Sequence, residues 1–188
     1  MIIVKTREEI ELMRESALIV SKTLGMIASE IKEGVTTLYL DKLAEEFIRD
    51  HGAVPSFLGL YDFPNSLCMS PNSQVVHGIP NNIPLQSGDV ISVDCGAFKN
   101  GYHGDQAYSF EIGEVAPDTK KLLQVTKESL YIGIREFKIG NRVEDVGNAI
   151  QKHTESHSYS VVRELHCIRG IRCVFEWHFL HLLPCFQL

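Results

Sequence analysis

The dipeptide Asn100–Gly101 constrains the local fold of this chain more tightly than any other short feature of its sequence. Asn-Gly favours a two-residue type I′ turn, because both positions accept a positive φ. The segment VDCGAFKNGYHGD, residues 93–105, therefore predicts two antiparallel strands that meet at this turn. Each arm contains an aspartate, Asp94 or Asp105, although aspartate is depleted in strands. The two carboxylates need an explanation beyond the formation of a surface hairpin.

The turn assignment sets the register of the predicted hairpin. Counting outward from the turn pairs Gly96 with Asp105 and Asp94 with Ala107. Because side chains alternate between faces, both aspartates lie on one face as diagonal neighbours, with their backbones roughly 7 to 8 Å apart. Gly96 lies between them and is expected to leave space, and His103 points to the same face as a partner or as a packing residue. A register shift of one residue would separate the aspartates.

Two carboxylates that share one site repel each other unless a cation binds or one of them is protonated. A pair of divalent metal ions is the solution that many hydrolases use. Acid–base chemistry, calcium binding and two solvated aspartates on an open sheet face are the alternatives that the residues leave open.

Two further segments contain candidate site residues. His77, in VVHGIP, is expected in an apolar-flanked strand, as a structural histidine or as a group that moves protons near the carboxylates. The segment LGLYDFPNSLCMS suggests an apolar pocket, and core packing is the alternative. Its apolar candidates are Leu60, Tyr61, Phe63 and Cys68.

Hydrophobic periodicity predicts an α/β chain of the α+β kind, with two helix pairs around a β-rich section. A shift of 106 residues places Lys32 and Gly34 on Lys138 and Gly140, which suggests a duplicated helix–helix–strand unit with VPSFLG and YSVVREL as the strands; chance similarity between two amphipathic helix pairs is the alternative. A second aspartate-bearing hairpin would fall beyond residue 188, so the second half is expected to be incomplete. The predicted helices cover about residues 6–31, 37–51, 118–136 and 142–155, with Thr6 as the first cap, and the β-rich section covers 56–111.

Composition excludes several classes of function. The net charge of −6 argues against binding to nucleic acid or to an anionic membrane. No apolar run approaches the roughly 20 residues of a membrane helix, and the charged N-terminus lacks the layout of a signal peptide. We therefore expect a cytoplasmic protein. The five cysteines form no CxxC pair, so neither a zinc ribbon nor a disulfide framework is indicated.

Residues 165–188 differ in composition from the rest of the chain. They contain three of the five cysteines, three of the eight histidines and the only tryptophan, with Glu176 as the one acidic residue. Their spacing fits no standard zinc motif. We interpret this segment as a foreign or mis-framed tail.

Three motifs in this order, FPNSLCMSPNSQVVHGIP, SGDVISVDCGAFKNGYHGDQAYSF and KESLYIGIREFKIGNRVEDVGNAIQKHTESHSYSVVREL, resemble the bacterial type I methionine aminopeptidases. The resemblance implies the duplicated pita-bread fold over residues 1–164, with a first half at about 1–114, the start of a second half at about 115–164, and a divergent tail at 165–188. It also implies removal of the N-terminal methionine of nascent polypeptides. Ribosome association and a monomeric state of the complete protein are further expectations.

The resemblance implies roles for matched residues. Asp94 and Asp105 match two of five ligands to a pair of divalent ions (Co, Mn, Fe or Zn), and His77 matches a histidine that contacts substrate and assists proton transfer. Phe63 and Cys68 match residues that line the methionine pocket. Leu60 stands where the family usually has tyrosine.

The chain departs from the family after VVREL. The family continues with a Gly-His-Gly motif whose histidine is the third ligand, and the ungapped position here is Ile168. Two later glutamate ligands have no match in this sequence. We therefore expect weak metal binding and little activity. A non-catalytic peptide-binding module, and a peptidase of the same fold specific for Xaa-Pro or dipeptides, are the alternatives.

Overall fold

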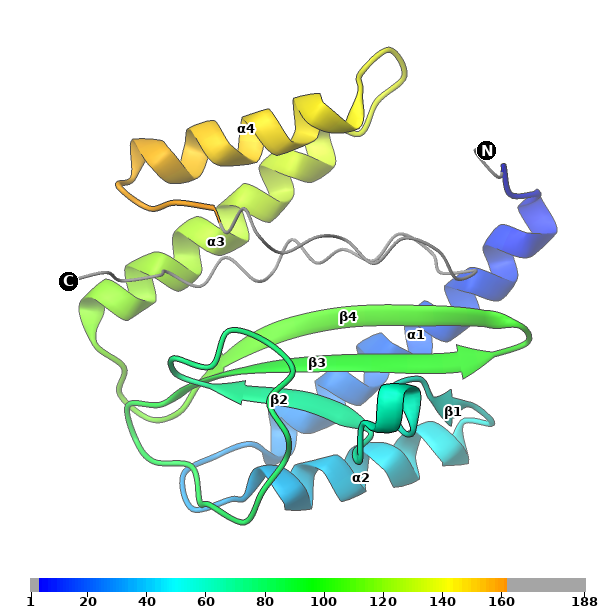
Figure 1. Cartoon of the computed structure of the whole chain (residues 1–188), viewed down its shortest axis with the longest axis vertical. Coiled ribbons are helices and arrows are strands. Elements are labelled where there is room, and N and C mark those ends of the chain that lie inside the picture. The colour runs from blue at the N-terminus through cyan, green and yellow to red at the C-terminus, as the bar shows by residue number, and fades with distance from the viewer. Residues whose placement is uncertain (1–3, 162–188) are drawn as a thin grey trace. The chain divides into compact units, whose positions relative to one another are not determined.

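The computed structural model describes residues 4–161 of the chain (Figure 1). The predicted divergent tail, residues 165–188, lies outside the described residues. The chain divides into two compact units, of which residues 4–114 and 115–161 are described, each by itself. Within the described residues, no helix has the length and apolar character needed to cross a bilayer.

The first unit begins with two helices, α1 (Arg7–Glu30) and α2 (Thr37–Asp50). Thr6 caps α1 as predicted: its hydroxyl accepts a hydrogen bond from the amide of Glu9, whose carboxylate accepts one from the amide of Thr6. The hydroxyl of Thr36 caps α2 in the same way through the amide of Tyr39. These caps satisfy amides that a helix leaves unpaired at its start.

The sheet of the first unit has β3 at its centre. β4 pairs with β3 along its full length, while β2 and β1 pair with different parts of β3. The predicted strand VPSFLG is wrong beyond its second residue, because Gly59 adopts a φ of 80° and leads into a short 3₁₀ helix, η1 (Leu60–Asp62). The strands are β1 (Val54–Pro55), β2 (Leu67–Pro71), β3 (Val90–Lys99) and β4 (Tyr102–Glu111).

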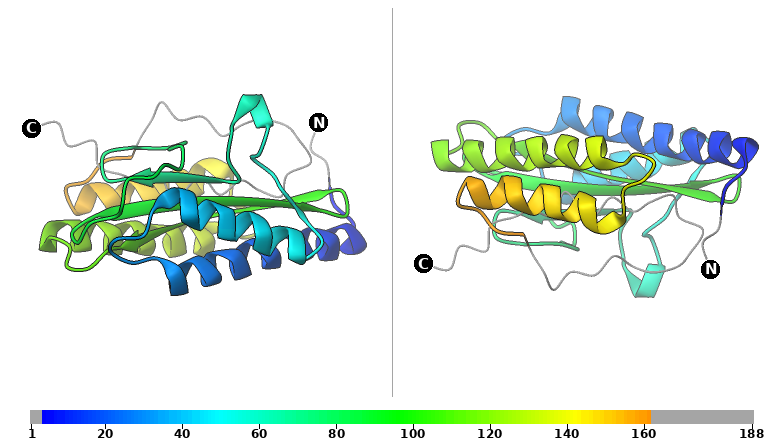
Figure 2. Two further views of the ribbon diagram at one scale, coloured as in Figure 1. Left: turned by 90° about the horizontal axis from the view of Figure 1, so that it is seen from below. Right: turned by 90° about the horizontal axis from the view of Figure 1, so that it is seen from above.

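Both helices of the first unit cover one face of its sheet, and η1 lies on the other side (Figure 2). α1 packs on β3 and β4, and α2 packs on β1 and β2. At Gly104 the helix comes so close that an added Cβ would lie 2.5 Å from the amide nitrogen of Ala17. The fully buried core includes Val20, Ile27, Leu40, Ala44, Ile48, Leu67, Ile91 and Val93.

The second unit contains the helices α3 (Pro117–Glu136) and α4 (Val143–Ser156), which pack against each other. Their close approach depends on Gly133, where an added Cβ would lie 2.8 Å from Cδ1 of Ile150. The buried apolar residues of this helix pair are Leu122, Val125, Val146 and Ile150.

The two helix pairs follow one backbone plan. α2 (Thr37–Asp50) and α4 (Val143–Ser156) start and end at positions that differ by the predicted 106 residues, and Glu30 and Glu136 end α1 and α3 at the same offset. Gly34 and Gly140 both adopt a positive φ, of 84° and 98°. The predicted duplication of the helix pair is therefore confirmed.

Candidate metal-binding active site

The β3–β4 turn has the predicted form. Asn100 has a φ of 52° and Gly101 a φ of 86°, the double positive φ of a type I′ turn. The observed register pairs Gly96 with Asp105 and Asp94 with Ala107. The hairpin prediction made from the Asn-Gly pair is therefore correct residue for residue.

This register places Asp94 and Asp105 on the face of the sheet opposite to α1 and α2. The neighbouring positions of β3, Val93 and Cys95, are fully buried in the helix-covered core. Asp94 is only 5% exposed and its Oδ1 atom is buried, while Asp105 is half-buried. Burial makes the charge of a carboxylate costly, so the pair favours a cation at this position.

Cys68 lies directly across from Asp94 in the β2–β3 ladder and shares its face. Burial, together with the smaller effects of the negative charges of Asp94, Asp105 and Asp41, raises the pKa of the Cys68 thiol to about 12. Cys68 is therefore a neutral thiol at physiological pH.

The space expected over Gly96 is filled. An added Cβ at Gly96 would lie 2.8 Å from Cε1 of Phe57 and 2.8 Å from Cβ of Ser56. Because glycine has no side chain, the Phe57 ring can pack directly on Gly96, on the face that carries the two carboxylates. His103 contacts Ser56 through Nδ1 and Oγ at 2.9 Å and tilts against Phe98, with ring centroids 4.6 Å apart.

His77 does not lie in a strand, contrary to expectation. It is exposed in the loop that follows β2, directly after a bend at Val76, and adopts a φ of 56°, in the left-handed region. The next residue, Gly78, docks this bend onto β2, because its amide donates to Oγ of Ser70 at 3.0 Å and its carbonyl accepts from the amide of Met69 at 2.8 Å. A Cβ at Gly78 would lie 2.1 Å from the carbonyl oxygen of Met69, so only glycine permits this contact.

Phe63 follows η1 and is half-buried. Tyr61, within η1, is 85% exposed and has a φ of 49°. The structure thus brings Asp94, Asp105 and Cys68 together on the sheet, whereas Phe63 and His77 lie on two separate segments outside it.

Sequence reasoning missed Asp41, which positions the start of β2. The Oδ1 atom of Asp41 accepts from the amides of Ser66 and Leu67 at 2.9 and 2.8 Å, and Oδ2 accepts from the side chain of Asn65 at 2.8 Å. Asp41 is 3% exposed, and burial raises its pKa above the usual value of 3.8. The sequence offered one signal for this role: Asp41 directly follows Leu40 on the apolar side of α2, where a charged residue is not expected unless it has a partner.

The carboxylates fit a divalent metal ion. Oxygen ligands from aspartate suit divalent cations, and two negative charges on one buried face compensate the charge of such an ion. Cys68 adds a thiol to the same face, across from Asp94.

Comparison with known proteins identifies the class first. The chain matches the model of metallopeptidase family M24 over residues 11–182, and it belongs to this family. Membership in a family of metallopeptidases implies that the chain binds a divalent metal.

Methionine aminopeptidases are among the similar members of this family. The chain is 46% identical to the methionine aminopeptidase of Clostridium perfringens and 48% identical to methionine aminopeptidase 1 of Bacillus subtilis, over 164 residues that cover 87% of this chain and 66% of each relative. The crystal structure of methionine aminopeptidase from Rickettsia prowazekii matches with a TM-score of 0.85 at 38% identity, over 87% of this chain and 66% of that one. This chain therefore has the pita-bread fold, and it spans just under two thirds of the length of these relatives.

Proposed function

We propose that this chain is a metalloaminopeptidase of the type that removes the N-terminal methionine from nascent polypeptides. The observation that carries the proposal is the in-register placement of Asp94 and Asp105 on one face of the β3–β4 hairpin in a member of metallopeptidase family M24. Methionine aminopeptidases with 46% and 48% identity support this substrate class over Xaa-Pro or other dipeptides.

The proposed roles follow from the position and chemistry of each residue. Asp94 and Asp105 would hold two divalent ions, with Co, Mn, Fe and Zn as candidates. When bound, such ions would polarise the substrate carbonyl and lower the pKa of water. His77, exposed beside β2, would contact the substrate and move a proton. Cys68 and Phe63 would contact the methionine side chain, because a neutral thiol and an aromatic ring suit an uncharged thioether.

Low activity of the printed 188-residue chain is part of the proposal. The resemblance places a metal-ligating histidine where this sequence has Ile168, whose side chain offers no lone pair. Two carboxylates are few ligands for two ions, so we expect weak binding.

The proposed substrate also defines a location. Nascent polypeptides are available in the cytoplasm, so the proposal places the protein there, in association with ribosomes and as a monomer.

Metal titration tests the carboxylate pair directly. We expect Mn²⁺ to bind weakly to the chain in isothermal titration calorimetry, and Asp94→Asn or Asp105→Asn to abolish that binding. Asp118→Asn, in the first turn of α3, is the control that should leave it unchanged. Unchanged Mn²⁺ binding in both hairpin variants would contradict the proposed site.

A substrate panel of Met-Ala, Xaa-Pro and other dipeptides tests the reaction. We expect slow hydrolysis of Met-Ala only, with added Co²⁺ or Mn²⁺, and its loss with chelator. Preferential hydrolysis of Xaa-Pro would show that the protein is a peptidase with Xaa-Pro specificity. Peptide binding without hydrolysis, unchanged by chelator, would identify a non-catalytic binding module.

A further inference from the structure

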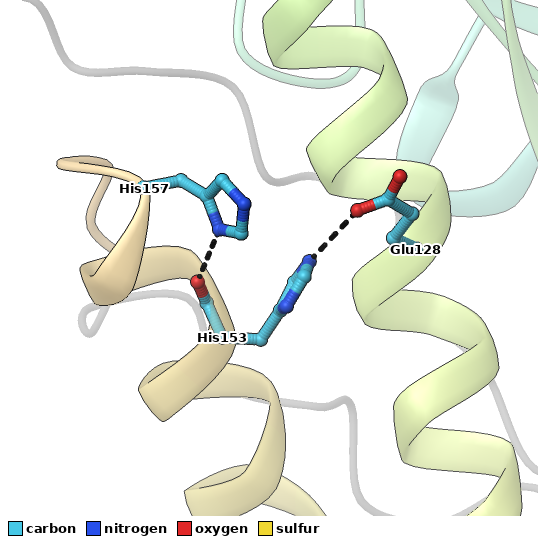
Figure 3. Close-up of side chains that lie close together, drawn as sticks. All are labelled: Glu128, His153 and His157. Atoms are coloured by element: carbon cyan, nitrogen blue, oxygen red, sulfur yellow. Dashed lines mark hydrogen bonds and ion pairs between the residues drawn. The ribbon is translucent and has the colours of Figure 1, made fainter.

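Three potential metal ligands converge in the second unit. Glu128 on α3 and His153 and His157 near the end of α4 each offer one ligand atom, and these atoms lie within 4.8 Å of one another (Figure 3). All three side chains are half-buried. His153 and His157 are four residues apart, so they lie on the same face of α4, one turn after the other.

The pair His153 and Glu128 has the spacing of two ligands on one ion. Nε2 of His153 lies 3.3 Å from Oε2 of Glu128. Ligands at about 2.0–2.1 Å from a tetrahedral zinc ion are separated by roughly 3.3–3.4 Å. Nε2 of His153 is also buried and makes no hydrogen bond to any group in the described part of the chain. Its 3.3 Å contact with Oε2 of Glu128 is an ion pair without hydrogen-bond geometry, and a metal ion bound by both atoms would give this buried nitrogen a partner.

His157 is oriented as a metal ligand would be. Its Nδ1 lies 2.9 Å from the carbonyl oxygen of His153. A carbonyl only accepts, so Nδ1 donates and Nε2 retains the lone pair in the neutral ring. Histidine ligands commonly donate their other ring nitrogen to a backbone carbonyl in this way.

Comparison with the first helix pair shows which features of Glu128, His153 and His157 are shared by both pairs and which are specific to the second. The equivalents of Glu128, His153 and His157 are Lys22, Phe47 and His51, at the common offset of 106 residues. His51 makes the same bond, from Nδ1 to the carbonyl oxygen of Phe47 at 2.8 Å, and its ring stacks on Phe47 at 4.2 Å.

The histidine that ends each helix pair is therefore a shared structural feature. The other two candidate ligands, Glu128 and His153, occur only in the second pair. The equivalent residues of the first pair are Lys22 and Phe47.

We propose that Glu128, His153 and His157 bind one zinc ion that joins α3 to α4. Two imidazoles and one carboxylate are an established zinc donor set and leave a fourth position for water. The positive charge of the ion would compensate the negative charge of the Glu128 carboxylate, and the ion would coordinate Nε2 of His153. The site uses none of the residues assigned to the aminopeptidase site.

Zinc titration of the 188-residue chain and its variants tests this site. We expect Glu128→Gln and His153→Phe to raise the apparent dissociation constant for one Zn²⁺ at least tenfold, and to abolish the zinc-dependent rise in melting temperature. His153→Phe recreates the Phe47–His51 pair that the fold already contains, and Glu128→Gln preserves shape, so loss of zinc without loss of helix content separates binding from folding. All variants keep the same cysteines, so zinc held elsewhere contributes equally.

Two matched variants complete the test. His51→Gln removes the equivalent histidine of the first pair and should leave zinc affinity unchanged, whereas His157→Gln should weaken it. Asp94→Asn should retain this zinc site, so its loss of Mn²⁺ binding and the loss of zinc in Glu128→Gln report on different sites. Unchanged zinc affinity in both Glu128→Gln and His153→Phe would overturn the proposal.

Discussion

The two helix pairs of this chain share a backbone plan and differ in the side chains placed on it. Both pairs turn at a glycine with positive φ, Gly34 or Gly140, and both second helices end at a histidine, His51 or His157. The buried positions of α2 and α4 coincide as well: Leu40, Ala44 and Ile48 correspond to Val146, Ile150 and Thr154. Backbone geometry therefore persists while the buried and functional side chains diverge.

The difference at one position shows how the first pair supports its site. Asp41 in α2 binds the backbone that leads into β2, while its counterpart in α4 is Gly147, where an added Cβ would meet no atom within 4 Å. The first pair thus holds a strand of the proposed active site through a buried carboxylate, whereas the second pair has a glycine at the equivalent position.

Core truncation should have the largest effect. Leu40 is 0% exposed and its counterpart Val146 is 1% exposed. Leu40→Ala is expected to cost about 2–5 kcal/mol of unfolding free energy through cavity formation. Val146→Ala removes two carbons and should cost about 1.5 kcal/mol. Urea denaturation, with hydrogen exchange resolved by helix, measures both, and equal costs would mean that the two pairs are packed alike.

Asp41→Ala should come next. The variant leaves the amides of Ser66 and Leu67 without the acceptor that they use in the fold, at an expected cost of about 2–4 kcal/mol. Asp41→Asn keeps one acceptor oxygen and should cost less. Gly147→Ala, the matched change in α4, should stabilise the chain by up to about 1 kcal/mol because alanine favours a helix. Chemical denaturation measures all three, and a neutral Asp41→Ala would show that water replaces the carboxylate.

Asp41 also predicts a pH dependence confined to the first pair. Its pKa is raised in the folded state by burial, so folding favours the protonated form. This contribution to stability is complete below the unfolded pKa of 3.8 and is lost as pH rises through the higher folded value. Asp41→Asn should remove this slope from a plot of unfolding free energy against pH. If Asp41→Asn shows the same slope of unfolding free energy against pH, the slope arises from another carboxylate.

The smallest effects are expected just after the two histidines. Gly52 has a φ of 68°, and at the equivalent position Ser158 has a φ of 65°. A side chain in this region costs about 1 kcal/mol. Gly52→Ala should therefore destabilise the chain by about that amount, and Ser158→Gly should stabilise it by about 0.5–1 kcal/mol. Thermal denaturation of the two variants should give melting temperatures that move in opposite directions.

Local patterns predicted most of the backbone. Helical periodicity and the cap at Thr6 located α1, and the Asn100–Gly101 turn set the β3–β4 register, because φ preferences and side-chain periodicity are properties of neighbouring residues. The same reasoning placed Asp94 and Asp105 on one face. It failed for His77, where Gly78 docks the backbone onto β2 and forces a bend that no local pattern encodes.

The sequence by itself determined the helix pairs, their repetition and the shared face of Asp94 and Asp105, since each depends on spacing along the chain. Tertiary structure decided what fills and surrounds that face. Phe57 covers Gly96, Asp41 holds the start of β2, and Glu128 meets His153 from another helix. These contacts join residues through packing of separate elements, and the preferences of neighbouring residues do not specify which side chains then meet.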